Sequence, residues 1–332
     1  MRGRNLHICI CGGGSLGHVC AGVLSSRPGI SVSILSGHPD SWNDTIEVTD
    51  PDGKVYSGHL ETVSSDPSEA LSGSDIVLLC VPGYLIEKTL KTIKPFIGEA
   101  AVGSVVCSTG FFFFAHDILG PGARLFGFQR VPYIARVAAY GSKALLLGYK
   151  TSLTAALENL PAEFTKTLER LFETPVTLAD NYLQVSLTNS NPILHTGRLY
   201  SMFKDKEDKV FDHNILFYKE WTDDASRTMI EMDKEFFTLL DKLHVKGIPT
   251  LLDYYESTDA ASLTHKISSI AAFQAITSPM ISCEGGWKLD RNSRYFTEDF
   301  PFGLRWIKEL AEKNNIETPV IDKVYDWGMK QI

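Results

Sequence analysis

The sequence has no concentration of positive charge and no long apolar segment. Its 332 residues carry a net charge of −8 without a Lys/Arg cluster, so the attraction that drives nucleic-acid binding has no evident source. Apolar runs such as 76–81 and 111–114 are far shorter than the ~18 residues that cross a bilayer. No charged-then-apolar leader with a small-residue cleavage site is recognisable. We therefore expect a cytoplasmic protein without nucleic-acid or membrane partners.

Cysteine is sparse and irregularly placed. The six cysteines lack the spacing of a metal site or of a disulfide framework, and most lie within or beside strand-like apolar runs: Cys9, Cys11, Cys20, Cys80, Cys107 and Cys283. We interpret them as reduced thiols and expect no bound metal. A hydrophobic content of 44% is enough for one large core or two ordinary ones, and we favour two domains for a chain of this length.

The first half of the chain alternates short apolar runs with helical patterns. Four runs have the length and composition of strands: Leu6 to Cys11, Ile30 to Leu35, Asp75 to Val81 and Ser104 to Cys107. Helical patterns follow the first and the third run, as at 84–93. Strands that alternate with helices predict crossover connections and hence an α/β fold with a parallel sheet.

A glycine-spaced turn joins the first strand to its helix. Gly12, Gly14 and Gly17 satisfy the pattern G-x-G-x-x-G. In such a turn the first glycine permits the sharp bend, the second lets a pyrophosphate approach, and the third allows close helix packing. The helix start then offers unpaired N–H groups to the phosphates. Because it follows a strand and opens a helix, the turn predicts a Rossmann-type dinucleotide-binding domain, with Ser15 and Leu16 as further cofactor contacts.

The choice between NAD and NADP depends on the end of the second strand. An acid about 20 residues beyond the glycines normally holds the ribose 2′-hydroxyl of NAD. Here Ser36 and His38 occupy that place, and the nearest acid is Asp40. A hydroxyl and an imidazole would not repel a 2′-phosphate, although no arginine stands there to bind one, so the sequence leans slightly to NADP. Val81 and Pro82, at the end of the third strand, complete the candidate cofactor contacts.

Beyond about residue 178 the helical patterns become longer. This change predicts a dinucleotide-binding domain over 1–178 and a mainly α-helical substrate and catalytic domain over 179–332. The clearest helix is 221–243, where apolar residues recur at three- and four-residue steps, and Thr222 should cap it. Asp259 is expected to cap another helix. We interpret the run 111–114 as packed core rather than as a platform for a nicotinamide ring.

The stretch 189–198, NSNPILHTGR, interrupts an otherwise apolar helical segment. Asn191 and His195 are four residues apart, so on a helix they share one face. Pro192 cannot donate to the helix ladder and its ring crowds the preceding turn, so the helix should kink or restart there. Such a kink would offer both polar side chains to a cleft. Alternatively, His195 is a buried histidine satisfied by a backbone carbonyl, and Asn191 caps a helix that restarts at Pro192.

A second polar group lies near the C-terminus. Arg294 and Asp299 stand among aromatic residues just ahead of a helical pattern at 304–313. Charged groups without partners are costly to bury. These residues therefore either contact a substrate or form a structural pair, in which Arg294 binds Glu298 or Asp299.

With these motifs the chain resembles the octopine/nopaline (opine) dehydrogenase family over nearly its whole length. The stretches that carry the resemblance are the Cys-Gly-Gly-Gly turn, Val81-Pro82, 132–136, Asn191-Pro192 with His195, and 294–303. The last is the most specific, because a ten-residue mixture of charges and aromatic rings seldom recurs by chance, whereas many dehydrogenases share the glycine turn.

The resemblance implies an NAD(P)H-dependent enzyme that joins an amino acid to a 2-oxo acid by hydride transfer to a C=N intermediate. It implies that His195 is the acid/base histidine, Asp299 the carboxylate paired with it, and Arg294 the arginine at the substrate carboxylate. Asn191, on the same helix face, is the fourth candidate catalytic residue. The expected partners are these small-molecule substrates, in a monomer or a homodimer.

Two other functions stay open. One is a 2-oxo acid or ketone reductase of the same two-domain plan, similar to ketopantoate reductase or glycerol-3-phosphate dehydrogenase, since nothing in the sequence identifies an amine pocket. The other is a non-catalytic dinucleotide-binding sensor. A sensor would keep the glycine turn but would not need His195, Asp299 and Arg294 together, so their joint presence counts against it.

Overall fold

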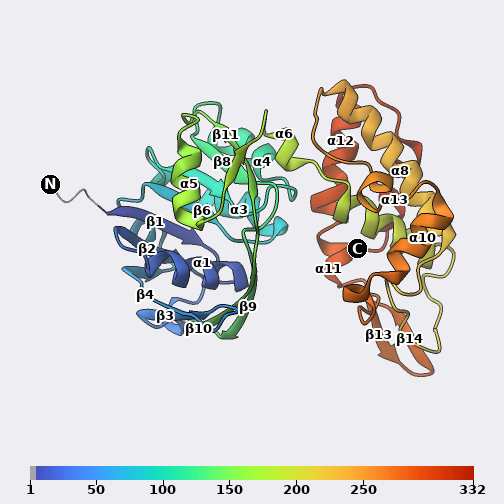
Figure 1. The fold of residues 1–332 in the computed structure, drawn as a ribbon, viewed down its shortest axis with the longest axis horizontal. Helices are drawn as coiled ribbons and strands as arrows, with labels where there is room; N and C mark the ends of the chain where they lie inside the picture. Colours follow the sequence, from blue (N-terminus) through green and yellow to red (C-terminus); the bar gives the residue numbers. More distant parts are fainter. Residues whose placement is uncertain (1–4) are drawn as a thin grey trace. The chain divides into compact units, whose positions relative to one another are not determined.

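The computed structural model describes residues 5–332 (Figure 1). The chain divides into two compact units, the first ending at Ser186 and the second running Leu187–Ile332. The boundary that we propose between functional domains, after residue 178, lies shortly before this division. The difference arises because β12 (Val176–Leu178) and α6 (Leu183–Ser186) both contact strand β11 (Leu153–Glu158) of the first unit.

A largely parallel sheet forms the centre of the first unit. Its eight strands run in the order β12-β11-β8-β7-β6-β1-β2-β5. The remaining bounds are β1 (Leu6–Cys11), β2 (Ile30–Leu35), β5 (Thr62–Ser64), β6 (Ile76–Leu79), β7 (Ala101–Ser104) and β8 (Leu125–Phe128). Within this sheet β8 and β11 pair antiparallel, and the other neighbouring strands pair parallel. The chain leaves β1 for β2 on one side and returns to β6 on the other, and dinucleotides bind at such a reversal of strand order. The predicted α/β fold with a Rossmann-type sheet is confirmed.

The expected strands are correct in part. The first two match β1 and β2, and the third is the shorter β6. The expected strand at 104–107 is wrong, because pairing with β6 begins three residues earlier, where Ala101 lies opposite Ile76. The chain leaves the sheet at Ser104, whose hydroxyl donates to the carbonyl of Val106.

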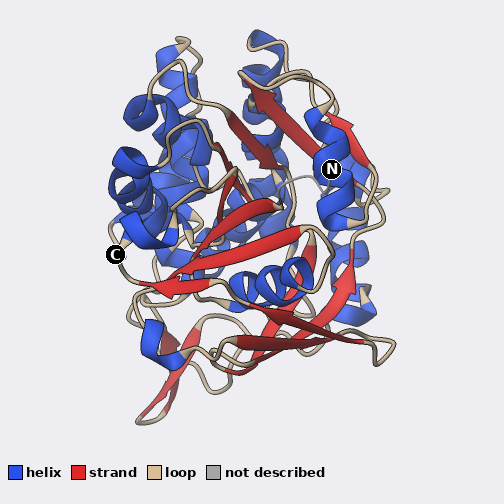
Figure 2. Ribbon diagram, turned by 90° about the vertical axis from the view of Figure 1, so that its left-hand side faces the viewer, coloured by secondary structure: helices blue, strands red, loops and turns tan. Residues whose placement is uncertain are grey.

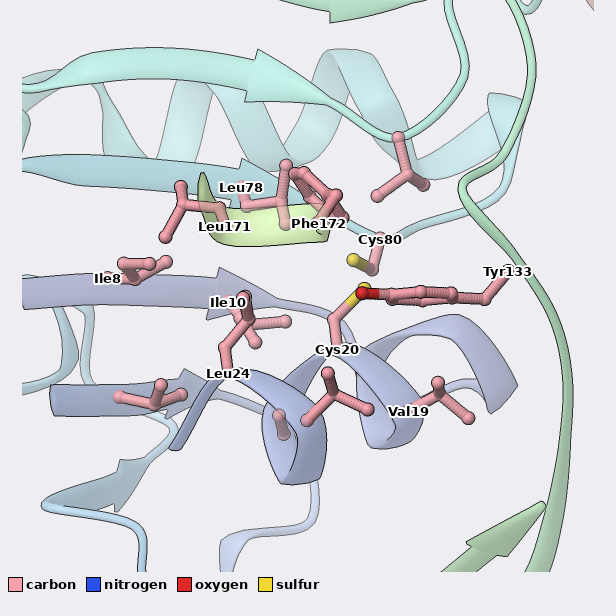
Figure 3. Close-up of a cluster of buried hydrophobic side chains, with 14 of the residues drawn as sticks. Ile8, Ile10, Val19, Cys20, Leu24, Leu78, Cys80, Tyr133, Leu171 and Phe172 are labelled. Carbon is pink, nitrogen blue, oxygen red and sulfur yellow. The ribbon is translucent and has the colours of Figure 1, made fainter. Parts of the chain in front are cut away.

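Helices cover the sheet and contribute part of its core, most of which comes from the strands. They are α1 (Ser15–Ser25), α2 (Pro67–Ala70), α3 (Gly83–Ile93), α4 (Phe111–Leu119), α5 (Phe164–Phe172) and the single 3-10 turns η1 (Pro39–Ser41) and η2 (Lys94–Phe96). Figure 3 shows Leu24 of α1 and Leu171 of α5 in one buried cluster with Ile8 and Ile10 of β1. The phenylalanine run begins α4 and is mostly buried, as expected for packed core.

A second, smaller sheet in the first unit was not expected from the sequence. Its four strands run β4-β3-β10-β9, with bounds β3 (Thr45–Thr49), β4 (Val55–His59), β9 (Tyr133–Ala139) and β10 (Lys143–Tyr149). Helix α1 packs against this sheet as well as against the large one, and a Cβ on Gly22 would lie 2.5 Å from the side chain of Val48. The helix that follows the glycine turn is therefore held from two sides (Figure 2).

The second unit is mainly helical, as predicted. Its helices are α7 (Thr196–Phe203), α8 (Asp223–Lys242), α9 (Leu251–Tyr254), α10 (Ala260–Ser269), α11 (Arg294–Thr297), α12 (Arg305–Lys313) and α13 (Pro319–Met329), with the 3-10 turn η4 (Ala271–Phe273) and a hairpin of β13 (Met280–Cys283) and β14 (Gly286–Leu289). Thr222 and Asp259 cap α8 and α10 through their side chains, as expected. Within residues 5–332 no helix is both long and apolar enough to cross a membrane.

Two turns of the second unit are π-helical. They are η3 (Ser190–His195) and η5 (Phe300–Leu304), and each contains a proline near its start. The predicted interruption at Pro192 thus takes the form of a wider turn that leads directly into α7.

Candidate functional site

Each glycine of the turn after β1 meets a different steric demand. Gly12 has φ +118°, and a Cβ there would lie 2.8 Å from the carbonyl oxygen of Cys80. A Cβ on Gly17 would collide with the carbonyl oxygen of Gly12. Gly14 has an extended backbone (φ −83°, ψ −174°), and a Cβ there would meet no atom within 4 Å. The fold itself does not need a glycine at Gly14, whereas a pyrophosphate lying against the backbone would.

The start of α1 is suited to an anion. Gly14 precedes the helix without a side-chain cap, and the first turn contains no acidic residue. The first N–H groups of an α-helix have no partner within the helix, and they carry the positive end of its dipole. Ser15 and Leu16 lie in this first turn. The residues present therefore fit the diphosphate of a dinucleotide.

A pocket of about 440 Å³ adjoins the glycine turn. It is lined by the turn, the end of β2 and α3, and its lining includes Gly12, Ser36, His38, Val81, Lys88 and Tyr140. Four of these are predicted cofactor contacts. Pro82, another predicted contact, begins α3 as its N-cap residue.

Ser36 has a structural task in this pocket. It is 6% exposed, and its Oγ accepts hydrogen bonds from the backbone N–H of His38 at 3.2 Å and from Nε1 of Trp42 at 3.3 Å. Its oxygen is thus already engaged in shaping the loop after β2. The side chain of His38 is exposed beside it, and so is that of Lys88, which the sequence did not single out. These two are the groups of the pocket that carry or can acquire positive charge.

His18, on α1, joins the glycine turn to the small sheet. It is fully buried, and its Nδ1 donates to the carbonyl of Gly14 at 3.0 Å while its Nε2 accepts from the backbone N–H of Gly141 at 2.7 Å. The ring also stacks on Trp42 at 4.2 Å. Burial lowers the pKa of His18, which favours the neutral imidazole. Because Nε2 accepts from the N–H of Gly141, the ring proton lies on Nδ1. The second glycine of the turn is therefore held by a histidine that sequence reasoning missed.

In the second unit, His195 and Asp299 lie together. Nδ1 of His195 is 2.8 Å from Oδ2 of Asp299, although the two are 104 residues apart in the chain. Both side chains are largely buried, with 14% and 17% of their surface exposed. Because a carboxylate can only accept, Nδ1 carries the proton and donates it to Asp299. Such a bond fixes the tautomer of the ring and stabilises its protonated form.

The two π-helical turns set this geometry. His195 ends η3, and Asp299 immediately precedes η5. The turns contact each other where Gly303 of η5 faces Pro192 of η3. A π turn presents side chains in a direction that a regular helix does not, and such turns often occur at functional sites.

Aromatic residues enclose the histidine. The ring of His195 lies edge-on to the rings of Tyr295 at 4.7 Å and Phe217 at 5.8 Å. Its second nitrogen, Nε2, is 3.1 Å from the hydroxyl of Tyr218. Burial, followed by the neighbouring charge of Tyr295, raises the pKa of Tyr218, so this hydroxyl keeps its proton. Sequence reasoning missed Tyr218, because it stands in an ordinary apolar run at 215–218 without any polar signal.

Among the described residues, neither Asn191 nor Arg294 forms a hydrogen bond or an ion pair with His195. Asn191 is exposed and lies within η3, which begins at Ser190, so it does not cap a helix that restarts at Pro192. Of the two asparagines in this stretch, Asn189 is the buried one. Its Nδ2 donates to Oδ1 of Asp233 at 2.7 Å. Arg294 is 84% exposed, and its guanidinium lies 3.9 Å from the carboxylate of Glu298. Such an exposed guanidinium is free to bind a carboxylate in two-point fashion, since its contact with Glu298 is long.

The side chains of residues 5–332 form no group of three or more His, Cys, Asp or Glu residues that could hold a metal ion. All six cysteines are free thiols in the structure, and Cys283 is the one that is not buried.

Comparison with known proteins identifies relatives over the full chain. Residues 178–331 match the family described as NAD/NADP octopine/nopaline dehydrogenase, alpha-helical domain, and residues 8–109 match ketopantoate reductase PanE/ApbA. The chain is 26% identical to an opine dehydrogenase from Haliotis discus hannai, over 99% of this chain and 91% of the relative. It is 27% identical to an octopine dehydrogenase from Pecten maximus, over 98% of this chain and 90% of the relative.

The fold has solved counterparts. A structure of octopine dehydrogenase with NADH and L-arginine matches with a TM-score of 0.88 and 25% identity, over 98% of this chain and 89% of that one. The resemblance inferred from the motifs is confirmed.

Proposed function

The chain carries the α-helical domain of the NAD/NADP octopine/nopaline dehydrogenase family, and from that premise we propose that it reductively condenses an amino acid with a 2-oxo acid. It is an NAD(P)-dependent oxidoreductase acting on a CH–NH bond. The observation that supports this most directly is the His195–Asp299 pair, buried among aromatic rings within that helical domain.

The reaction needs a group that both accepts and donates protons. The ammonium of the amino acid must lose a proton before its nitrogen attacks the oxo carbon, and the resulting hydroxyl must gain one before it leaves as water. Histidine is the side chain best suited to both tasks near neutral pH, and the carboxylate of Asp299 stabilises the imidazolium formed between them. The bound nicotinamide supplies the hydride that reduces the C=N bond.

Two further groups have proposed roles in holding the substrates. The exposed guanidinium of Arg294 matches the planar carboxylate that a 2-oxo acid presents. Asn191, exposed at the start of the same π-helical turn that His195 ends, is suited to a neutral polar contact with substrate. Both assignments rest on the family motifs together with this exposure.

For the cofactor we propose a slight preference for NADPH over NADH. Ser36 rather than an acid stands directly after β2, where a ribose 2′-hydroxyl would be bound, and the exposed side chains of His38 and Lys88 line the pocket where a 2′-phosphate would lie. Lys88→Met should weaken NADPH binding roughly 2- to 10-fold and leave NADH binding nearly unchanged. Lys91→Met, one helical turn later and outside this pocket, is the matched control. Equal losses for both cofactors would contradict a phosphate contact at Lys88.

A 2-oxo acid reductase remains the second candidate, because residues 8–109 match the ketopantoate reductase model. NAD(P)H oxidation, measured against a panel of 2-oxo acids with and without amino acids, distinguishes the two functions. We expect turnover that requires both substrates. Turnover with an oxo acid alone, unchanged by any amine, would instead identify a simple reductase. Cofactor binding without turnover on any pair would favour a dinucleotide-binding sensor.

A further inference from the structure

Both ring nitrogens of His195 are already engaged. Nδ1 donates to Asp299 at 2.8 Å, and Nε2 lies 3.1 Å from the hydroxyl of Tyr218. With the proton on Nδ1, the bond at Nε2 runs from the Tyr218 O–H to the nitrogen. A substrate proton therefore cannot reach the histidine directly while these two bonds are in place.

We propose that the hydroxyl of Tyr218 exchanges protons with the substrate and relays them to and from Nε2 of His195, which makes Tyr218 a catalytic residue. The inference rests on the proposed function and adds a third member to the Asp299–His195 pair.

The relay balances without any further reactant. When the substrate ammonium gives a proton to the Tyr218 oxygen, the hydroxyl proton moves to Nε2, and His195 becomes an imidazolium held by Asp299. The free amine then forms the C–N bond, and its nitrogen passes a second proton to the former carbonyl oxygen. The imidazolium returns its proton through Tyr218 to that hydroxyl, the C–O bond breaks, and water leaves. Tyrosine accepts and donates in one movement, so it never becomes a phenolate.

The surroundings of Tyr218 favour this role. Burial raises its pKa, so the hydroxyl stays protonated over the working pH range and serves as a conduit rather than as a base of its own. Its ring is fixed between Phe273 at 4.6 Å and Trp221 at 6.1 Å. An oxygen held at a constant distance from Nε2 is what a proton relay needs.

A buried arginine holds the loop that carries Tyr218. Arg198 is 2% exposed and stands on α7, one turn beyond His195. Its guanidinium donates to the carbonyl of Phe217 at 3.1 Å and to that of Glu220 at 2.6 Å, one residue before and two residues after the tyrosine. Burying a guanidinium is costly unless it is hydrogen-bonded in this way. The start of α7 thus positions His195 directly and positions Tyr218 through Arg198.

The test compares Tyr218→Phe with His195→Gln in amine-dependent NAD(P)H oxidation, with both substrates saturating. Loss of the hydroxyl should lower kcat roughly 100-fold or more, as removal of a general acid–base does, and the double variant should lose little beyond His195→Gln. Cofactor affinity, measured by fluorescence titration, should not change.

Tyr200→Phe is the matched control, because Tyr200 is equally buried, in the same unit, but packs on Trp327 away from His195. Should Tyr218→Phe fail to fold, the parent enzyme still tests the relay: turnover in mixtures of H₂O and D₂O should report more than one proton in flight.

The outcomes separate the two proposals. Parent-like or faster turnover in Tyr218→Phe, beside an inactive His195→Gln, would overturn the relay and leave the proposed function intact. If turnover in the H₂O and D₂O mixtures reports a single proton in flight, the relay is likewise overturned and the proposed function stays intact. A parent enzyme without amine-dependent turnover would contradict the proposed function itself, and the relay with it.

Discussion

Gly303 lies against the ring of Pro192: a Cβ on Gly303 would stand 3.1 Å from Cγ and 3.4 Å from Cβ of the proline. The two residues belong to the π-helical turns η5 and η3. Asp299 precedes one turn and His195 ends the other, so this contact joins the two turns that carry the pair.

Gly303→Val should therefore force the two turns apart. Overpacking of this kind costs about 1–3 kcal/mol, so we expect a lower melting temperature. A longer His195–Asp299 bond should reduce kcat as well. Thermal unfolding and kcat, measured on the same preparation, check this prediction. An unchanged kcat at a lowered melting temperature would mean that the contact supports the fold alone.

Gly14→Val should abolish tight cofactor binding while leaving the fold intact. The backbone at Gly14 is extended and its surroundings are open, so a branched side chain fits the protein but occupies the space of a pyrophosphate. Fluorescence titration of NADH and NADPH measures the loss. Gly122→Val, at another open glycine of the same unit, is the control and should bind normally. Normal cofactor affinity in Gly14→Val would contradict a phosphate cradle at this turn.

His195→Gln should lower turnover about 100- to 10,000-fold with cofactor affinity nearly unchanged, since general acid–base catalysis contributes that much. Asp299→Asn should also lower turnover. The two together should lose little more than His195→Gln alone, because paired groups are non-additive. If His195 only filled space, its replacement would lower the melting temperature and leave kcat within a few-fold of the parent.

Arg294→Lys should raise the KM for the 2-oxo acid more than it lowers kcat. A lysine keeps the charge but cannot reproduce a two-point contact with a carboxylate. Stability should not change, because the side chain is 84% exposed and its contact with Glu298 is long. Initial rates over a range of oxo acid concentrations measure the effect. An unchanged KM would remove Arg294 from the substrate site.

His18 should make the stability of the first unit sensitive to acid. Its folded pKa is lowered by burial from the usual 6.5, so the unfolded chain binds a proton before the folded one does. The stability that the buried neutral His18 contributes is complete above pH 6.5, the unfolded pKa, and is lost as the pH falls toward the lowered pKa of the folded protein. Protonation would also cost Nε2 its bond from Gly141. His18→Gln should therefore be less stable at pH 7.5 but should lose less stability between pH 7.5 and 5.5.

Thermal unfolding at several pH values measures this difference between His18→Gln and the parent. His265→Gln, at an exposed histidine, is the control and should follow the parent at every pH. Parallel pH profiles for His18→Gln and the parent would show that His18 titrates alike in the folded and unfolded chain.

The elements that could be predicted from the sequence are those specified by local patterns. The glycine turn, the first two strands and helix α8 depend on spacing, apolar runs and a capping threonine, all of which lie within a few residues of one another. The small sheet was predictable in part, since β3 and β4 alternate buried and exposed residues on either side of Asp50, whose carboxylate accepts from Lys54 N–H at 2.9 Å. Its other half, β9 and β10, was not expected from any such signal.

The candidate site was harder to predict because its contacts are long-range. His195 and Asp299 could be named from the family resemblance, but nothing in the sequence indicates that Tyr218 contacts His195 or that Arg198 binds the carbonyl of Phe217. The π-helical turns were not predicted for another reason. A helix is recognised in a sequence by the regular spacing of its apolar residues, and a π turn interrupts that spacing for only five or six residues.

The wider turns also affect how this sequence should be compared with its relatives. In η5 the backbone N–H of Leu304 bonds to the carbonyl of Asp299, five residues back instead of the usual four. Deleting one residue from such a turn lets it close as an α turn, while the helix beyond keeps its orientation. A homologue that is one residue shorter at η3 would then hold its histidine in the same place, and an alignment without a gap there would pair the wrong residues.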